Sequence, residues 1–162
     1  MKGFRAVIQI ALLALLSQVS MLAMAQSPSY GPNINLEQAR KIIAAGQVEA
    51  KKNSWNMAIA VVDTAGQLVA FDKMDDTQTG SIDVSQDKAR SSAIYRRPSK
   101  VFEDAVAAGG AGTRFFNLRN VSTVEGGLPI VVGGKIIGAV GVSGASSQQD
   151  GMVAKVGAEA LK

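Results

Sequence analysis

The spacing of apolar and polar residues changes several times along the chain, and each change marks the boundary of an expected element. Apolar residues three and four positions apart predict amphipathic helices. Asn35 and Gln38 can form a capping box before the first helix, and Ser147 and Asp150 can do so at the start of the last. Pro98 separates the two central helices, because the residue before a proline avoids the helical conformation. The predicted helices cover 36–52, 81–96, 100–108 and the segment that begins at 147.

Runs of β-branched and other apolar residues predict strands that pair as two hairpins. The turn of the first hairpin lies at 63–66, and Gly133 and Gly134 suit the positive φ angles of the second. The predicted strands cover 57–62, 68–74, 128–132 and 135–143. The segment 111–124 follows neither spacing, and we expect Phe115 and Phe116 to fill the core from a loop or short strand.

The order of these elements is helix, hairpin, two helices, hairpin, helix. Two hairpins separated by helices predict an α+β domain with a mainly antiparallel sheet of about five strands and helices packed on its faces. Methionines in the apolar segments are expected in the core, as is one side of the last helix. These residues are Met57, Met74, Met152, Val153, Val156 and Ala160.

The first 25 residues have the order of a secretory signal peptide. Lys2 and Arg5 precede an apolar run over 6–16, and an Ala-Met-Ala site follows at 23–25. An uncleaved anchor helix is the alternative, although the apolar run is short for a membrane span. The sequence therefore predicts a signal peptide over 1–25, a flexible leader over 26–34 and one domain over 35–162. The mature protein is expected in the periplasm or secreted, with no membrane span.

The composition of the mature domain excludes several kinds of partner and site. Removal of Lys2 and Arg5 with the signal peptide lowers the formal net charge from +4 to +2, which does not favour nucleic acid as a partner. The chain has no cysteine and no histidine. It therefore lacks thiolate chemistry and the commonest general base and metal ligand, and no protein-bound metal site is expected.

The stretch EGGLPIVVGGKIIGAVGVSG over 125–144 contains seven glycines among residues that favour strands. Each glycine inside an element costs roughly 0.5–1 kcal/mol relative to alanine, so these positions must serve a tight turn, close packing by a helix or another subunit, or a ligand that lies against the backbone. Gly138 and Gly141 fall on opposite faces of the expected strand. Packing of a helix or second subunit is favoured there, and contact with a ligand is the alternative.

Three segments in this order resemble the GlcG/HbpS-like family, which also includes the C-terminal domain of PduO-type proteins. They are VSQDKARSSAIYRRPSK over 84–100, EGGLPIVVGGKIIGAVGVSG over 125–144 and SSQQD over 146–150. The resemblance implies a profilin-like fold with a five-stranded antiparallel sheet, assembly into dimers and larger oligomers, and haem or tetrapyrrole binding in several members. The absence of histidine departs from relatives that offer a histidine ligand to the iron.

Candidate ligand contacts cluster in two of these segments. The positive side chains of Arg96, Arg97 and Lys100, with Arg90 one turn or more before them, can stabilise a helix C-terminus, or they can bind carboxylates such as haem propionates. Tyr95 beside them is the favoured axial or contact residue, and the turn at 125–127 can present backbone N–H groups to an acidic ligand or simply expose its glutamate. The candidate ligand-binding residues are Arg90, Tyr95, Arg96, Arg97, Lys100, Glu125, Gly126 and Gly127.

Three functions remain open at this stage. The favoured one is a self-associating small-molecule binding protein, with haem or another tetrapyrrole as ligand. The second is an enzyme of the same fold acting on a small carboxylic acid, with Glu125 or Asp87 as base. The third is a structural or interaction module without a ligand. No catalytic residue is assigned.

Overall fold

The computed structural model describes residues 27–162. The predicted signal peptide over 1–25 lies outside the described residues. The elements are α2 (Leu36–Lys52), β1 (Ala58–Val62), β2 (Leu68–Lys73), α3 (Ser81–Tyr95), α4 (Lys100–Ala107), the 3-10 helix η1 (Gly110–Asn117), β3 (Gly127–Val132), β4 (Lys135–Ser143) and α5 (Ser147–Glu159). The four helices and four strands predicted from residue spacing are therefore confirmed, with bounds that differ by at most one residue.

The sheet is antiparallel and has four strands within the described residues, in the order β2-β1-β4-β3. The prediction of five strands is wrong. The segment after α4 forms η1 instead of a strand, because Gly109 and Gly110 turn the chain with positive φ angles of 70° and 54°. Phe116 is 63% exposed, so this segment does not fill the core as expected.

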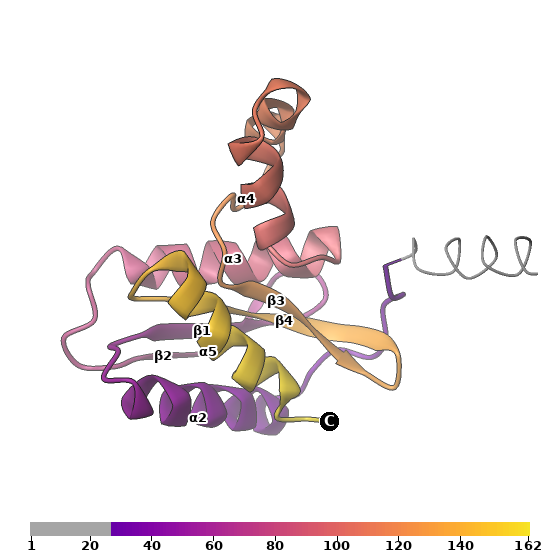
Figure 1. Cartoon of the computed structure of the whole chain (residues 1–162). Helices are drawn as coiled ribbons and strands as arrows, with labels where there is room; N and C mark the ends of the chain where they lie inside the picture. The colour runs from indigo at the N-terminus through magenta and orange to yellow at the C-terminus, as the bar shows by residue number, and fades with distance from the viewer. Residues whose placement is uncertain (1–26) are drawn as a thin grey trace, which may run out of the picture.

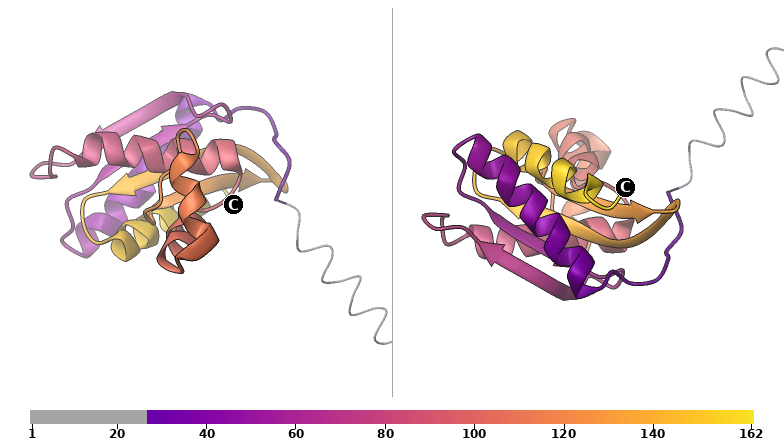
Figure 2. Two further views of the ribbon diagram at one scale, coloured as in Figure 1. Left: turned by 90° about the horizontal axis from the view of Figure 1, so that it is seen from above. Right: turned by 90° about the horizontal axis from the view of Figure 1, so that it is seen from below.

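Helices cover both faces of the sheet. Figure 1 and Figure 2 show α2 and α5 side by side on one face and α3 on the other. The larger core lies under α2 and α5, where Ile42 and Val153 pack with Ile59 and Val140 of the central strands. The smaller core lies under α3 and consists largely of alanines, which keep that helix close to the strands.

Two glycines of the 125–144 stretch provide room for α3. A Cβ on Gly141 would overlap the carbonyl oxygen of Ser85, and one on Gly127 would overlap the carbonyl oxygen of Lys88. Close packing of a helix therefore explains both missing side chains. It also sets α3 directly against the strand that borders the candidate ligand site.

The start of the last helix differs slightly from the prediction. Ser146 and Gln149 form the capping box, rather than Ser147 and Asp150. Val153 is buried as expected, whereas Met152 is 52% exposed. Val156 and Ala160 are exposed as well. Met152, Val156 and Ala160 are spaced four residues apart, so they share the side of α5 that faces away from the core.

Residues 29–34 of the expected leader run beside β4. The amide of Ile136 donates to Ser29 O at 2.9 Å, and the amide of Gly31 donates back to Ile136 O at 2.7 Å. Ile34 is buried, and the Tyr30 hydroxyl donates to Ala93 O at 2.9 Å. This segment therefore ties the beginning of α2 to the sheet and to α3.

Helix α4 and η1 project away from the sheet and its helices (Figure 1). Phe102 of α4 packs edge-on against Tyr95 and Phe115, with ring centroids 5.5 and 5.2 Å apart. These rings hold the projection together at its base. No helix within 27–162 is long and apolar enough to cross a membrane.

Candidate functional site

The structure divides the predicted ligand-binding residues among three places. Arg90 lies on α3, where its Nε donates to Gly66 O at 3.3 Å and its guanidinium lies 3.5 Å from Asp87. Arg90 thus fastens the turn between β1 and β2 to α3. Neither Arg90 nor Asp87 lines a cleft with the other candidates.

Tyr95, Arg96 and Arg97 form the second group, at the C-terminal end of α3. The Tyr95 hydroxyl donates to Arg119 O at 2.7 Å. Arg96 adopts a left-handed conformation with φ of 53°, and its guanidinium lies 5.6 Å from the centre of the Tyr30 ring. Arg97 stacks on the Phe102 ring at 5.7 Å. These side chains attach neighbouring segments to the end of α3 through hydrogen bonds and cation–π contacts.

Lys100, Glu125, Gly126 and Gly127 form the third group and do come together. They line a cleft of about 250 Å³ between the base of α4, the beginning of β3 and α5. Its lining residues are Pro98, Lys100, Glu125, Gly126, Gly127, Leu128, Gly151 and Lys155. The structure therefore assembles half of the predicted site and adds Lys155 and Gly151 from α5.

A second cleft of about 290 Å³ continues along the same strand and helix. It shares Leu128 and Lys155 with the first. Its lining residues are Leu128, Pro129, Val131, Lys155, Ala158, Glu159 and Lys162. We call the two adjoining clefts the β3–α5 groove, which is mainly apolar along its walls and carries charges at its rim.

Lysines supply the positive charge of the β3–α5 groove. The Lys100 ammonium lies 2.8 Å from Asp104 Oδ1 and 3.8 Å from Glu125 Oε2. Its hydrogen bond to Asp104 raises the pKa of Lys100 above the ordinary value, so this lysine stays charged. Lys162 pairs with Glu159 at 3.0 Å, whereas Lys155 has no ion-pair partner among residues 27–162. Lys155 is thus free to bind an anionic group.

A buried ion pair lies directly beneath the first cleft. Lys88 Nζ donates to Asp150 Oδ2 at 2.7 Å and to Val142 O at 3.1 Å, and the two side chains are 1% and 3% exposed. Burial raises the pKa of the Asp150 carboxyl, and the hydrogen bond and charge of Lys88 oppose that shift. The pair joins α3, β4 and α5 at one point.

Gly126 separates this ion pair from the cleft. Its φ of 127° disfavours other residues, and a Cβ there would lie 2.6 Å from Val142 O and 2.8 Å from Lys88 Nζ. A side chain at this position would therefore push the lysine away from its two acceptors. Gly126 has a structural role that the sequence motif did not reveal.

The turn at 125–127 has few free backbone donors for a ligand. The amide of Gly127 donates to Ser99 Oγ at 2.9 Å, and the amide of Glu125 donates to the Glu103 carboxylate. Two of the three backbone N–H groups of the turn are therefore occupied, which leaves the lysine side chains as the main groups for recognition of an anion in this cleft. No group of three potential metal-ligating His, Cys, Asp or Glu side chains occurs within the described part of the chain.

Sequence reasoning missed Lys88, Lys155 and the role of Asp150, which it predicted to be a helix cap. A signal for Lys88 exists, because this lysine falls on the same helical face as Ser85, Ala89 and Ser92, which are small and buried. A lone lysine on such a face requires a buried partner. Nothing in the local sequence indicates that the partner lies 62 residues away.

Comparison with known proteins assigns the family. The family model described as haem degrading protein HbpS-like matches residues 34–159. Protein GlcG of Escherichia coli K12 is 46% identical over 110 residues, which are 68% of this chain and 81% of that protein. Klebsiella pneumoniae protein ORFY has a similar crystal structure, with a TM-score of 0.74, 28% identity and coverage of 84% of this chain and 95% of that chain.

A crystal structure of PduOC in complex with haem also has this fold. Its TM-score is 0.73 at 23% identity, and the alignment covers 80% of this chain and 96% of that chain. The family match, the GlcG identity and these structural similarities agree with the resemblance found in the sequence. This chain belongs to the HbpS-like family.

Proposed function

We propose that this protein is an exported, self-associating binding protein whose ligand is haem or another tetrapyrrole, held in the β3–α5 groove. The observation that carries the proposal is an elongated groove with apolar walls and lysines along its rim. That chemistry suits a flat apolar ring with carboxylate substituents. A family member, PduOC, was crystallised with haem, which supports the ligand class.

The walls of the groove match the ring. Pro98, Leu128, Pro129 and Val131 provide apolar contacts, and the glycines of the first cleft let a ring edge approach the backbone. Clefts of about 250 and 290 Å³ are each small for a tetrapyrrole, but the two adjoin lengthwise. The ring therefore lies across both, with one face left open in a single chain.

The lysines of the β3–α5 groove can pair with the acidic groups of a tetrapyrrole. Lys155 is shared by both clefts and has no ion-pair partner within the described residues, so it is the first candidate to bind a propionate. Lys100 at one end is a second candidate, although Asp104 and Glu125 already share its charge. An ammonium bound to a carboxylate in a partly apolar groove forms a charge-assisted hydrogen bond.

The iron contributes little to this binding. The groove offers no imidazole, thiolate or thioether among its lining residues, so a strong axial bond is not expected. Affinity then depends on burial of the ring and on lysine–carboxylate pairing. Without a strong axial bond, the protein recognises haem through its flat apolar ring and its two carboxylates. A metal-free porphyrin has the same ring and carboxylates and should bind almost as well.

Self-association would cover the open face of the bound ring. Exposed apolar residues lie next to the groove, namely Val132 on β3 and Met152 and Val156 on α5. Burial of these side chains against a second copy supports assembly through this edge. Export to the periplasm or beyond rests on the predicted signal peptide, and intact mass of the mature protein tests cleavage after residue 25.

The enzyme hypothesis retains one candidate base. Glu125 lines the groove 3.8 Å from Lys100, whereas Asp87 lies on α3 with Arg90 and does not line it. Asp150, whose pKa burial raises, lies sealed beneath Gly126. Binding requires only the groove and its lysines, and it is the function that these positions support best.

The test is a titration of the mature protein with haemin and with protoporphyrin, followed by absorbance and by quenching of Trp55 fluorescence. We expect the two affinities to agree within about tenfold, or roughly 1.4 kcal/mol. Lys155→Gln should weaken both ligands by a similar factor, and the matched change Lys73→Gln on β2 should weaken neither. Absence of saturable binding of either ligand would refute the proposal.

Two further outcomes would relocate or change the site. A larger loss of affinity from Arg96→Ala with Arg97→Ala than from Lys155→Gln would place the ligand at the end of α3 instead. Tight binding of haemin without binding of protoporphyrin would reveal an axial ligand, for which Tyr95 is the first residue to substitute.

A further inference from the structure

The β3–α5 groove has two distinct ends, because both of its walls run in the same direction. Strand β3 contributes Gly127 and Leu128 to the first cleft and Val131 to the second. Helix α5 contributes Gly151 to the first cleft and Glu159 to the second. We call the first cleft the α4 end of the groove and the second cleft its far end. The charges at the two ends decide how an asymmetric ligand lies between them.

Carboxylates dominate the α4 end. The Lys100 ammonium lies 2.8 Å from Asp104 Oδ1 and 3.8 Å from Glu125 Oε2. The Glu103 carboxylate lies close to the same lysine and accepts the amide of Glu125. Three carboxylates therefore lie around one ammonium, and the formal charge of this group of side chains is negative.

Glu125 closes the α4 end of the groove. Its side chain is 20% exposed, and an added Cβ on Gly151 of α5 would overlap its Oε1 oxygen. The missing side chain of Gly151 thus leaves the space that this carboxylate occupies. The N-terminal end of α5, whose dipole attracts anions, already has Glu125 and the first-turn residue Asp150 beside it. Little attraction remains there for the acidic group of a ligand.

Lys155 provides positive charge beyond the α4 end. It lies one turn further along α5 than Gly151 and has no ion-pair partner among residues 27–162. Glu159 at the far end is paired with Lys162 at 3.0 Å. A ligand carboxylate therefore finds a free ammonium at Lys155, whereas Lys100 at the α4 end is already shared by two carboxylates.

We propose that the β3–α5 groove selects tetrapyrroles whose carboxylates lie on one edge of the ring, and that Glu125 sets this specificity. The inference rests on the proposed function. The acidic edge of the ring lies toward Lys155, and the uncharged edge lies at the α4 end against Pro98 and Leu128. A ring with carboxylates on both edges brings one of them to Glu125 in either orientation. Like charges at short range disfavour binding.

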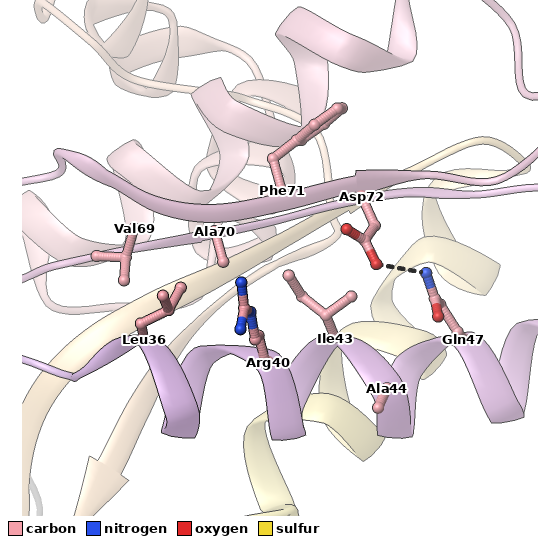
Figure 3. Close-up of a pocket in the computed structure, with 9 residues that line it drawn as sticks. All are labelled: Leu36, Arg40, Ile43, Ala44, Gln47, Val69, Ala70, Phe71 and Asp72. Carbon is pink, nitrogen blue, oxygen red and sulfur yellow. Dashed lines mark hydrogen bonds between the residues drawn. The ribbon is translucent and has the colours of Figure 1, made fainter.

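The cleft at the β2 edge of the sheet has no such division into ends. Its volume is about 360 Å³, and its lining surface is mainly polar. Figure 3 shows Arg40 in the middle of this cleft, with Leu36 on one side and Ile43 and Asp72 on the other. A flat ligand would meet the guanidinium at its centre rather than at one edge. This cleft is therefore unsuited to the same ligand.

Mesoporphyrin IX and coproporphyrin III test the specificity, because they share one ring and one acidic edge. They differ only on the opposite edge, where propionates of coproporphyrin replace the ethyl groups of mesoporphyrin. Quenching of Trp55 fluorescence in protein prepared without the predicted signal peptide gives both affinities. We expect mesoporphyrin to bind about tenfold more tightly. The ratio should approach one as salt rises to about 1 M, because salt screens the repulsion.

Two substitutions at the α4 end should act in opposite directions on coproporphyrin. Glu125→Gln removes negative charge and should tighten coproporphyrin by about fivefold. Lys100→Gln leaves the carboxylates without their ammonium and should weaken coproporphyrin by about threefold. Each should change mesoporphyrin by less than about twofold. Glu37→Gln on α2, which does not line the groove, is the matched control and should change neither. A general loss of structure would not produce effects of opposite sign.

The outcomes separate this inference from the proposed function. Equal affinities for the two porphyrins would overturn the specificity while the tetrapyrrole site stands. A loss of mesoporphyrin affinity in Lys100→Gln as large as that in Lys155→Gln would overturn the orientation of the ring. An unchanged affinity ratio in Glu125→Gln would overturn the role of Glu125. Absence of saturable mesoporphyrin binding would remove the proposed function and the inference with it.

Discussion

The two outer strands of the sheet, β2 and β3, are each covered by a helix, but the polar contacts that support them differ in burial. Each has a helix on the same face of the sheet and a groove between helix and strand. Beneath the β3 edge lies the buried pair of Lys88 and Asp150, while the comparable polar contact at the β2 edge joins exposed Gln47 and Asp72. A buried, hydrogen-bonded pair joins α3, β4 and α5 at one point, whereas an exposed contact contributes little to stability.

This difference favours the β3 edge as the site of a rigid ligand. A rigid edge offers a preformed surface to a rigid planar ligand, because little conformational entropy is lost on binding. The comparison is useful because each edge can be changed without touching the other.

The largest contrast is expected from removal of one member of each polar contact. Lys88→Met leaves Asp150 buried without its partner and should lower the free energy of unfolding by about 3–5 kcal/mol. Gln47→Met at the β2 edge should cost less than about 1 kcal/mol. Urea unfolding followed by circular dichroism measures both. Similar losses of unfolding free energy for the two variants would show that the buried ion pair does not stabilise the β3 edge more than the exposed contact stabilises the β2 edge.

Gly126→Ala should have the next largest effect. The added methyl group would meet Val142 O and Lys88 Nζ in a conformation that disfavours alanine, with an expected cost of about 2–3 kcal/mol. Gly133→Ala is the matched control, since Gly133 also has a positive φ but no atom within 4 Å of an added Cβ. It should cost about 1 kcal/mol. Equal costs would mean that the ion pair adjusts freely beneath the cleft.

A smaller effect is expected on self-association. Met152→Lys places a charge among the exposed apolar residues of the β3 edge and should weaken association by about tenfold, measured by light scattering over a concentration series. Leu68→Lys makes the same change at the β2 edge and should leave association almost unaltered. A larger effect of Leu68→Lys than of Met152→Lys would assign the interface to the β2 edge. If the unaltered protein is monomeric, the proposed interface does not exist.

Residue spacing predicted the four α-helices and four strands because the side chains of each element repeat with a period of 3.6 or 2 residues. Gly133 and Gly134 could be assigned to a turn and Gly141 to close packing, whereas the structural roles of Gly126 and Gly127, which were predicted to contact a ligand, were not foreseen. The number of strands was not predictable in this way, since the chain turns at Gly109 and Gly110 into η1 and the following residues 118–124 form no strand. A short irregular segment has no period from which its conformation can be inferred.

The site was predictable only in part. Lys100 and the 125–127 turn meet because Ser99 bonds Gly127, a contact that joins segments 28 residues apart. Arg96 and Arg97 are neighbours of Lys100 in the sequence, but the left-handed conformation of Arg96 ends α3 and turns the chain between them. Lys155 entered the site only through packing of α5 beside β3, which no local pattern encodes.

The most direct test of the account is to map bound protoporphyrin on the amide spectrum of isotope-labelled protein prepared without the predicted signal peptide. Glycine amides occupy a separate region of that spectrum, and Gly126, Gly127 and Gly151 line the β3–α5 groove. We predict that these amides shift or broaden together with Leu128 and Lys155, while Ala70 and Asp72 of β2 stay unchanged. Changes confined to β2, or to the residues around Arg96 at the end of α3, would contradict the placement of the tetrapyrrole at the β3 edge.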